Sequence, residues 1–153
     1  MMPEINFHTA SVPVFQRYLG SLSAWLARAQ ARGEGEAALL QARLAPDMLP
    51  LAVQCEIAAN FALRACYPLA GLAVPPYGEF AASFEGLQAR IAHAQGLIGA
   101  LNPAAFEHTA LRTIHGDAGQ ARLALPAQEF LLHYTLPNFF FHISMAYAIL
   151  RQQ

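Results

Sequence analysis

The chain has 153 residues, of which 56% are hydrophobic and 12% are charged, and its net charge is -1 at pH 7. This length predicts a single domain, residues 1–153, with enough interior for a real core. The small charge and the lack of a basic cluster exclude a typical nucleic-acid-binding protein. The large apolar fraction predicts that part of the surface is covered by a second copy, in a homodimer.

Two features of the sequence predict a cytoplasmic protein. Cys55 and Cys66 fall eleven residues apart in one predicted helix, so about 16 Å of helix axis separates them. They are too far apart to form a disulfide, and such thiols are typical of a reducing compartment. The N-terminal residues MMPEINFHTA contain neither the basic nor the apolar region of a signal peptide.

Apolar residues recur at intervals of three and four near the start of the chain and predict an amphipathic helix over residues 11–31. They are Val12, Phe15, Leu19, Leu22, Leu26 and Ala29. Ser11 is a suitable N-cap, and Gly33 and Gly35 end the helix. A short helical turn is expected over residues 36–43.

A second helix is predicted over residues 49–69, with Asp47 as its cap and Pro50 in its first turn. Its apolar face carries Leu51, Ala58, Phe61, Ala62, Ala65 and Leu69. Gln54 falls on the same face, and the many alanines allow a neighbouring helix to approach closely. The following segment, residues 68–78, is rich in Pro and Gly and predicts an irregular connection along the end of a bundle.

A third helix is predicted over residues 80–101, and Asn102-Pro103 ends it. Its apolar stripe consists of Phe80, Phe84, Leu87, Ile91, Ala94 and Ile98. Residues 104–125 have no long helical period. They predict a hairpin-like insert in which residues 115–119 lie between two short strands. Pro126 is then expected to open the last helix.

The stretch FLLHYTLPNFFFHISMAYAIL, residues 130–150, contains no Asp, Glu, Lys or Arg. Its length is sufficient for a membrane span, but the polar side chains His133, Asn138 and His142 would be costly inside lipid. A buried helix is therefore the better interpretation, and this helix should be the most buried of the four. Four helices of about this length with a short β-like insert before the last predict an all-α four-helix bundle.

Polar residues in the predicted core are the candidates for a site. Asn138 and His142 are four residues apart and share one helix face, whereas His133 would lie on the opposite face unless Pro137 kinks the helix and re-aims it. The candidate ligand-binding residues are Gln54, Asn138, His142, His133 and Tyr147. Two interpretations remain open: a ligand pocket or degenerate metal site, or a buried hydrogen-bond network in which Asn138 satisfies the carbonyl that Pro137 leaves free. The residues alone favour the network.

Motifs of other chemistries are missing from the sequence. It contains no HxxxH or HExxH metal motif, no GxSxG nucleophile motif and no glycine-rich phosphate loop. Cys55 and Cys66 lack an obvious activating group, so buried, unreactive thiols are expected. Whether the protein is an enzyme stays open at this point, and His142 is the one candidate catalytic residue.

Three segments resemble a bacterial family of uncharacterised function in the DinB/YfiT-like superfamily, which includes metalloenzymes. They are SVPVFQRYLGSLSAWLARA, ARLAPDMLPLAVQCEIAANFA and LPNFFFHISMAYAILR. The resemblance covers essentially the whole chain. It implies an up-down-down-up four-helix bundle with one long crossover, often paired as a dimer. Some members of the superfamily bind a divalent metal through three His, and some of those transfer low-molecular-weight thiols.

The metal-binding pattern of that superfamily is incomplete in this chain. Gln54 stands where the resemblance places the His of the second helix, and Asn138 where it places the first His of an HxxxH on the fourth, so only His142 is retained. Such a set is poor for zinc or nickel, and no cofactor is expected. We therefore predict a small-molecule-binding or interaction module with a degenerate metal site. The alternative is a metal-dependent thiol S-transferase or hydrolase that uses His142.

Overall fold

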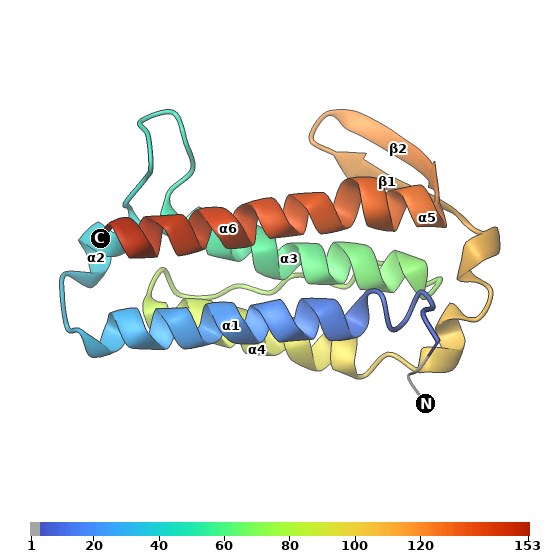
Figure 1. The fold of residues 1–153 in the computed structure, drawn as a ribbon, viewed down its shortest axis with the longest axis horizontal. Coiled ribbons are helices and arrows are strands. Elements are labelled where there is room, and N and C mark those ends of the chain that lie inside the picture. Colours follow the sequence, from blue (N-terminus) through green and yellow to red (C-terminus); the bar gives the residue numbers. More distant parts are fainter. Residues whose placement is uncertain (1–3) are drawn as a thin grey trace.

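The structure, a computed structural model, describes residues 4–153 and is a bundle of four long helices with one small hairpin (Figure 1). The long helices are α1 (Val12–Ala31), α3 (Leu51–Leu69), α4 (Phe84–Gly99) and α6 (Leu136–Gln152). The short elements are α2 (Glu36–Leu40), the 3-10 turns η1 (Pro103–Phe106) and η2 (Thr109–Leu111), strands β1 (Thr113–Ala118) and β2 (Ala121–Pro126), α5 (Ala127–Glu129) and the π-helical segment η3 (Phe130–Thr135). The all-α prediction is confirmed.

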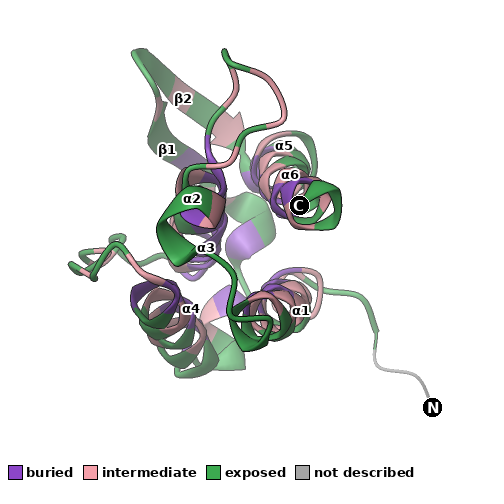
Figure 2. Cartoon of the chain, turned by 90° about the vertical axis from the view of Figure 1, so that its left-hand side faces the viewer, coloured by how far each residue is buried: buried purple, intermediate pink, exposed green. Residues whose placement is uncertain are grey.

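The helices follow the predicted up-down-down-up order. In Figure 1, α1 and α6 run from right to left, whereas α3 and α4 run from left to right. The chain therefore returns along the length of the bundle between α3 and α4, over residues 70–83, and does not simply cross its end as the sequence suggested. Viewed along the bundle, α1 lies beside α4 and α3 lies beside α6 (Figure 2).

Helix α3 is the most buried of the four, so the expectation that the last helix would be is wrong. Leu51, Ala58, Ala62 and Ala65 of α3 are fully buried, because its small side chains let neighbours approach on several sides. α3 packs against α1, α4 and α6 and also touches β1, whereas α6 packs mainly against α3 and α1. The outer face of α6 consequently stays open, and Phe141 is 50% exposed.

The two cysteines lie in α3. Cys55 and Cys66 are free and buried. Desolvation raises the pKa of the Cys55 thiol to about 12 and also raises the pKa of the Cys66 thiol, so both stay protonated and unreactive at neutral pH.

Over residues 4–153, none of the helices combines the length and the apolarity that a membrane crossing requires.

Two helix starts differ from the sequence-based prediction. The N-cap of α3 is Pro50, which has no capping side chain, and Asp47 lies in the turn before it. α4 begins at Phe84, four residues later than predicted, because side chains hold its first turn there. The Ser83 hydroxyl accepts a hydrogen bond from the Gly86 N–H at 3.0 Å, and the Glu36 carboxylate accepts one from the Phe84 N–H at 2.6 Å.

The insert is an antiparallel hairpin, but its turn is shorter than predicted. Ala118 pairs with Ala121, so the turn consists of Gly119 and Gln120 only, and Gly119 has a φ of 61°. Glycine adopts such a φ without steric cost, which suits a two-residue hairpin turn. His115 therefore lies inside β1, opposite Ala124, and its side chain is exposed as expected.

The last helix changes its hydrogen-bond pattern ahead of its proline. At the end of η3 the Leu136 N–H donates to the carbonyl of Leu131, five residues back, and Pro137 then falls in the first turn of α6. A first-turn proline leaves no intrahelical donor missing. A π-helical turn also rotates the residues before it relative to those after it. The predicted local disturbance at Pro137 is thus a change of helix type.

Gly86 and Gly96 of α4 provide a matched test of this packing. A Cβ on Gly86 would overlap the backbone carbonyl of Ala81 in the crossover, whereas a Cβ on Gly96 would meet nothing within 4 Å. We expect Gly86→Ala to lower the free energy of unfolding by about 1–3 kcal/mol. Gly96→Ala should raise it by about 0.5–1 kcal/mol, because alanine is the better helix former. Urea denaturation of both variants measures this, and equal effects would contradict the described crossover.

Candidate functional site

The structure joins two of the predicted site residues directly. Gln54 lies in the second turn of α3 and is 2% exposed, and half-buried His142 faces it from α6. The Gln54 Oε1 and the His142 Nδ1 are 2.7 Å apart. Because an amide oxygen can only accept, the His142 Nδ1–H must donate. The Gln54 amide in turn donates to the carbonyl of Leu49 at 3.4 Å, next to the start of α3.

The other predicted site residues lie elsewhere. The Asn138 amide donates to the carbonyl of Tyr134 at 2.7 Å, and not to the His133 carbonyl or to the Gln54–His142 pair. His133 is exposed on the outer side of η3. Tyr147, five residues after His142 on α6, is 45% exposed and packs on Trp25 of α1. Of the five candidates, only Gln54 and His142 are joined by a hydrogen bond.

The surroundings of His142 keep its ring neutral. Desolvation by burial lowers the pKa of His142 below its ordinary value of 6.5, and the positive charge of Arg64 lowers it further. The neutral ring is the form that matches the Gln54 hydrogen bond, with the proton on Nδ1.

The residues at this position fit a transition metal poorly. Across residues 4–153, no three His, Cys, Asp or Glu side chains come close enough together to hold a metal ion. Of the three side chains at the position implied by the superfamily, two are amides, and both are engaged in hydrogen bonds: Gln54 with His142, and Asn138 with a backbone carbonyl. A single imidazole with neutral amides is a weak ligand set for zinc or nickel.

A cation and two aromatic rings extend this contact along α3 and α6. Phe61 lies between the two helices, with its ring centroid 6.1 Å from that of His142 and 5.9 Å from that of Tyr134. The guanidinium of Arg64 lies over the Phe61 ring, 4.4 Å from its centroid. The same guanidinium donates to the Tyr134 hydroxyl at 2.7 Å and to the backbone carbonyl of Asp117 in β1 at 2.8 Å.

Arg64 and Tyr134 line a cavity of about 360 Å³ beneath the hairpin. Its lining residues are Arg64, Pro68, Val74, Tyr77, His115, Asp117, Phe130 and Tyr134. They come from α3, the crossover, β1 and η3, so four separate parts of the chain build this site. Burial raises the pKa of the Tyr77 phenol, and the smaller effect of Arg64 opposes it, so Tyr77 is a protonated hydrogen-bond donor at neutral pH.

Arg64, Tyr77 and Tyr134 were not among the residues predicted from the sequence. One signal was available: Arg64 follows the apolar-face residue Phe61 by three positions, so the two share a side of the second helix. No pattern in the sequence indicated that Tyr77 lines the cavity, because its position depends on the path of an irregular crossover. The position of Tyr134 in the cavity depends on the π-helical turn.

The Gln54–His142 pair leads to a stability prediction with a pH dependence. At pH 7.5, His142→Ala should lower the free energy of unfolding by about 1–3 kcal/mol, because the buried Gln54 oxygen loses its donor. The folded-state pKa of His142 lies below 6.5, so the unfolded chain binds a proton more readily as the pH falls. The stability due to His142 is therefore complete above about pH 6.5 and is lost as the pH falls through the folded-state pKa. Urea denaturation at pH 7.5 and pH 5 measures both effects.

Asn138→Ala is the matched control, since it removes another half-buried side chain of α6 and leaves His142 in place. The difference in stability between wild type and His142→Ala should narrow at pH 5, whereas the difference between wild type and Asn138→Ala should not. An unchanged difference for His142→Ala would mean that the pair does not carry the pH dependence.

Comparisons with known proteins agree with the fold. The family model described as a domain of unknown function, DUF1993, matches residues 7–153. A crystal structure of a DinB family member protein from Shewanella denitrificans superposes with a TM-score of 0.82 at 29% identity, covering 95% of this chain and 84% of that one. A search of curated proteins gave no match. The chain therefore belongs to the DUF1993 family, a DinB-like family of unknown function.

Proposed function

We propose that the protein is a binding module for a small organic carboxylate, with the ligand held by Arg64 in the cavity beneath the hairpin. The observation that carries this proposal is the state of the Arg64 guanidinium. It is half-buried and held in place, yet over residues 4–153 it forms no ion pair with a carboxylate. A partly desolvated cation is costly unless an anion or several hydrogen bonds compensate it.

The hydrogen bonds of Arg64 leave part of its fork for a ligand. Both of its described hydrogen bonds, to the Tyr134 hydroxyl and to the Asp117 carbonyl, use Nη2. Nη1 and Nε can therefore still donate, and each can give a carboxylate oxygen one charge-assisted hydrogen bond. The Phe61 ring beneath the guanidinium fixes its plane. Less of the binding free energy is then spent on ordering the arginine side chain.

The rest of the cavity suits a compact ligand with an apolar body. Phe130 and Val74 contribute apolar surface, and the Tyr77 hydroxyl is a further donor. Asp117 also lines the cavity and can accept a hydrogen bond from a hydroxyl or amino group of the ligand. One arginine with one acidic neighbour favours a singly charged ligand over a polyanion.

The Gln54–His142 pair has a supporting role in this proposal. The pair occupies the position where the superfamily places a metal centre, and it holds α3 against α6. The Phe61 ring, over which the Arg64 guanidinium lies, is between these two helices. Binding is favoured over the metal-dependent enzyme alternative, because across residues 4–153 no three His, Cys, Asp or Glu side chains come together to hold the metal that it would need. The degenerate metal site is thus a structural pair next to a binding cavity.

The proposal is tested by titrating the protein with benzoate and following heat release by calorimetry. Wild type should bind in a saturable way, and Arg64→Gln should weaken binding at least tenfold, because the variant loses the charge and part of the fork. Arg122→Gln is the control, since Arg122 is an exposed arginine on β2 of the same hairpin and does not line the cavity. Equal binding by wild type and Arg64→Gln would reject the proposal.

We also propose that the protein is a cytoplasmic homodimer, in which the open face of α6 packs against a second copy. Phe141 of α6 is 50% exposed and Leu132 of η3 is 47% exposed, and large exposed apolar side chains are typical of interaction sites. Sedimentation velocity at micromolar concentration should give a dimer for wild type. Phe141→Asp should give a monomer, and a monomeric wild type would contradict this proposal.

A further inference from the structure

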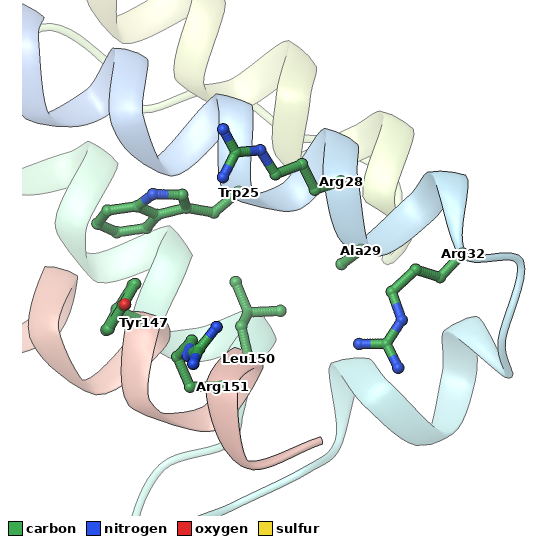
Figure 3. Close-up of a pocket in the computed structure, with 7 residues that line it drawn as sticks. All are labelled: Trp25, Arg28, Ala29, Arg32, Tyr147, Leu150 and Arg151. Carbon is green, nitrogen blue, oxygen red and sulfur yellow. The ribbon is translucent and has the colours of Figure 1, made fainter.

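A second cavity lies at the opposite end of the bundle, where α1 and α6 end side by side (Figure 3). Its volume is about 290 Å³. The lining residues are Trp25, Arg28, Ala29, Arg32, Tyr147, Leu150 and Arg151. None of them takes part in the Gln54–His142 pair or in the Arg64 cavity, so this place is independent of the function proposed above.

Positive charge is concentrated at this cavity. The chain has nine cationic residues, all of them arginines, and three line this one cavity. Arg32 pairs with Glu34 at 3.2 Å, but both side chains are mostly exposed. In the part of the chain that the structure describes, Arg28 and Arg151 form neither an ion pair nor a side-chain hydrogen bond. Two guanidinium groups are therefore available for an anion.

Helix chemistry explains these arginines only in part. Arg28 lies in the last turn of α1 and Arg151 in the last turn of α6, where a cation offsets the partial negative charge of a helix C-terminus. If each arginine served only its own helix end, the two guanidinium groups would not need to lie close together. Here α1 and α6 are parallel, so both ends meet, and Arg32 adds a third guanidinium beside α2 (Figure 3).

The cavity also has an aromatic wall. Trp25, which is the single tryptophan of the chain, and Tyr147 have ring centroids 4.9 Å apart at an interplanar angle of 60°. In Figure 3 the indole ring of Trp25 lies above the Tyr147 ring, and the Leu150 side chain stands beside them. Tyr147 is 45% exposed, so its ring is open to a ligand. Aromatic rings bind a second flat ring by offset or edge-to-face packing.

We propose that this cavity binds a small aromatic phosphate, with the ring against Trp25 and Tyr147 and the phosphate between Arg28 and Arg151. Several guanidinium groups match a doubly charged phosphate better than a single carboxylate, because each arginine can donate two parallel hydrogen bonds to its oxygens. The volume limits the ligand to a compact molecule with one ring system. This specificity differs from that of the Arg64 cavity, which has one arginine and an acidic neighbour.

Trp25 makes the proposal directly testable, because its fluorescence reports on this cavity alone. Titration with phenyl phosphate should change the Trp25 emission in a saturable way. Inorganic phosphate, which lacks the ring, and benzyl alcohol, which lacks the charge, should each bind at least tenfold more weakly. Arg28→Gln and Arg151→Gln should each raise the dissociation constant for phenyl phosphate at least fivefold. Both side chains are exposed, so these variants should fold normally, and thermal melts verify this.

Two controls separate the cavity from general attraction between charges. Arg17→Gln removes an exposed arginine of α1 outside the cavity, and Arg122→Gln removes an exposed arginine of β2 that does not line it. Both should keep the wild-type dissociation constant. The proposal is overturned if phenyl phosphate gives no saturable change, if inorganic phosphate binds equally well, or if Arg17→Gln weakens binding as much as Arg28→Gln.

Discussion

The antiparallel contact between α3 and α6 is the constraint on which the rest of the structure depends. Gln54 meets His142 near one end of this contact, and Arg64 meets Tyr134 toward the other, with the Phe61 ring in between. Gln54 and Arg64 are ten residues apart, so the polar contacts span about 15 Å of helix. Because the two helices run in opposite directions, each of these contacts fixes the same register.

That register also determines where the hairpin can dock. Arg64 donates to a backbone carbonyl of β1 and to the Tyr134 hydroxyl, so a single side chain connects the strand, α3 and the π-helical segment. A shift of one residue between α3 and α6 would move Tyr134 away from Arg64 and open the cavity beneath the hairpin. A metal ion bound by three ligands from the same two helices would impose a comparable restraint. In this chain a buried amide–imidazole hydrogen bond is found at that position, which keeps the helices in register without a metal.

The sequence was sufficient for the helices, and the family resemblance for their order. It also placed Gln54 and His142 among the candidates for one site. Apolar residues at intervals of three and four predicted the first three long helices, and a continuous apolar stretch predicted the last. The centre of the bundle was harder to predict. Overall apolarity indicated that the last helix would be the most buried. α3 is the most buried instead, because Ala58, Ala62 and Ala65 let neighbouring elements approach it closely. An apolar residue such as Phe141 can also lie on an open face.

The rest of the site depends on features that local patterns do not encode. The partner of Asn138 follows from the π-helical turn, which changes which carbonyl lies within reach of its side chain. The Arg64 cavity requires an irregular crossover and a hairpin to fold back onto α3, and its residues are far apart in the sequence. Tyr147, a candidate ligand-binding residue together with His142, packs instead on Trp25, because α1 and α6 are adjacent at that level.

The parallel arrangement of α1 and α6 has a consequence for the chemistry of the two ends of the bundle. Parallel neighbours bring two helix C-termini together, and their partial negative charges repel anions and each other. Arg28 and Arg151 offset that charge, and removing either one would leave this end less favourable for an anion than a neutral surface. α3 and α6 are antiparallel, so their dipoles oppose each other along the contact that carries Arg64. Arg64 there has two hydrogen bonds and an aromatic face, but among residues 4–153 no carboxylate partner. The two cavities lie on the order of 25 Å apart along the last helix and so present arginines in different electrostatic settings, one beside opposed helices and one at aligned helix ends.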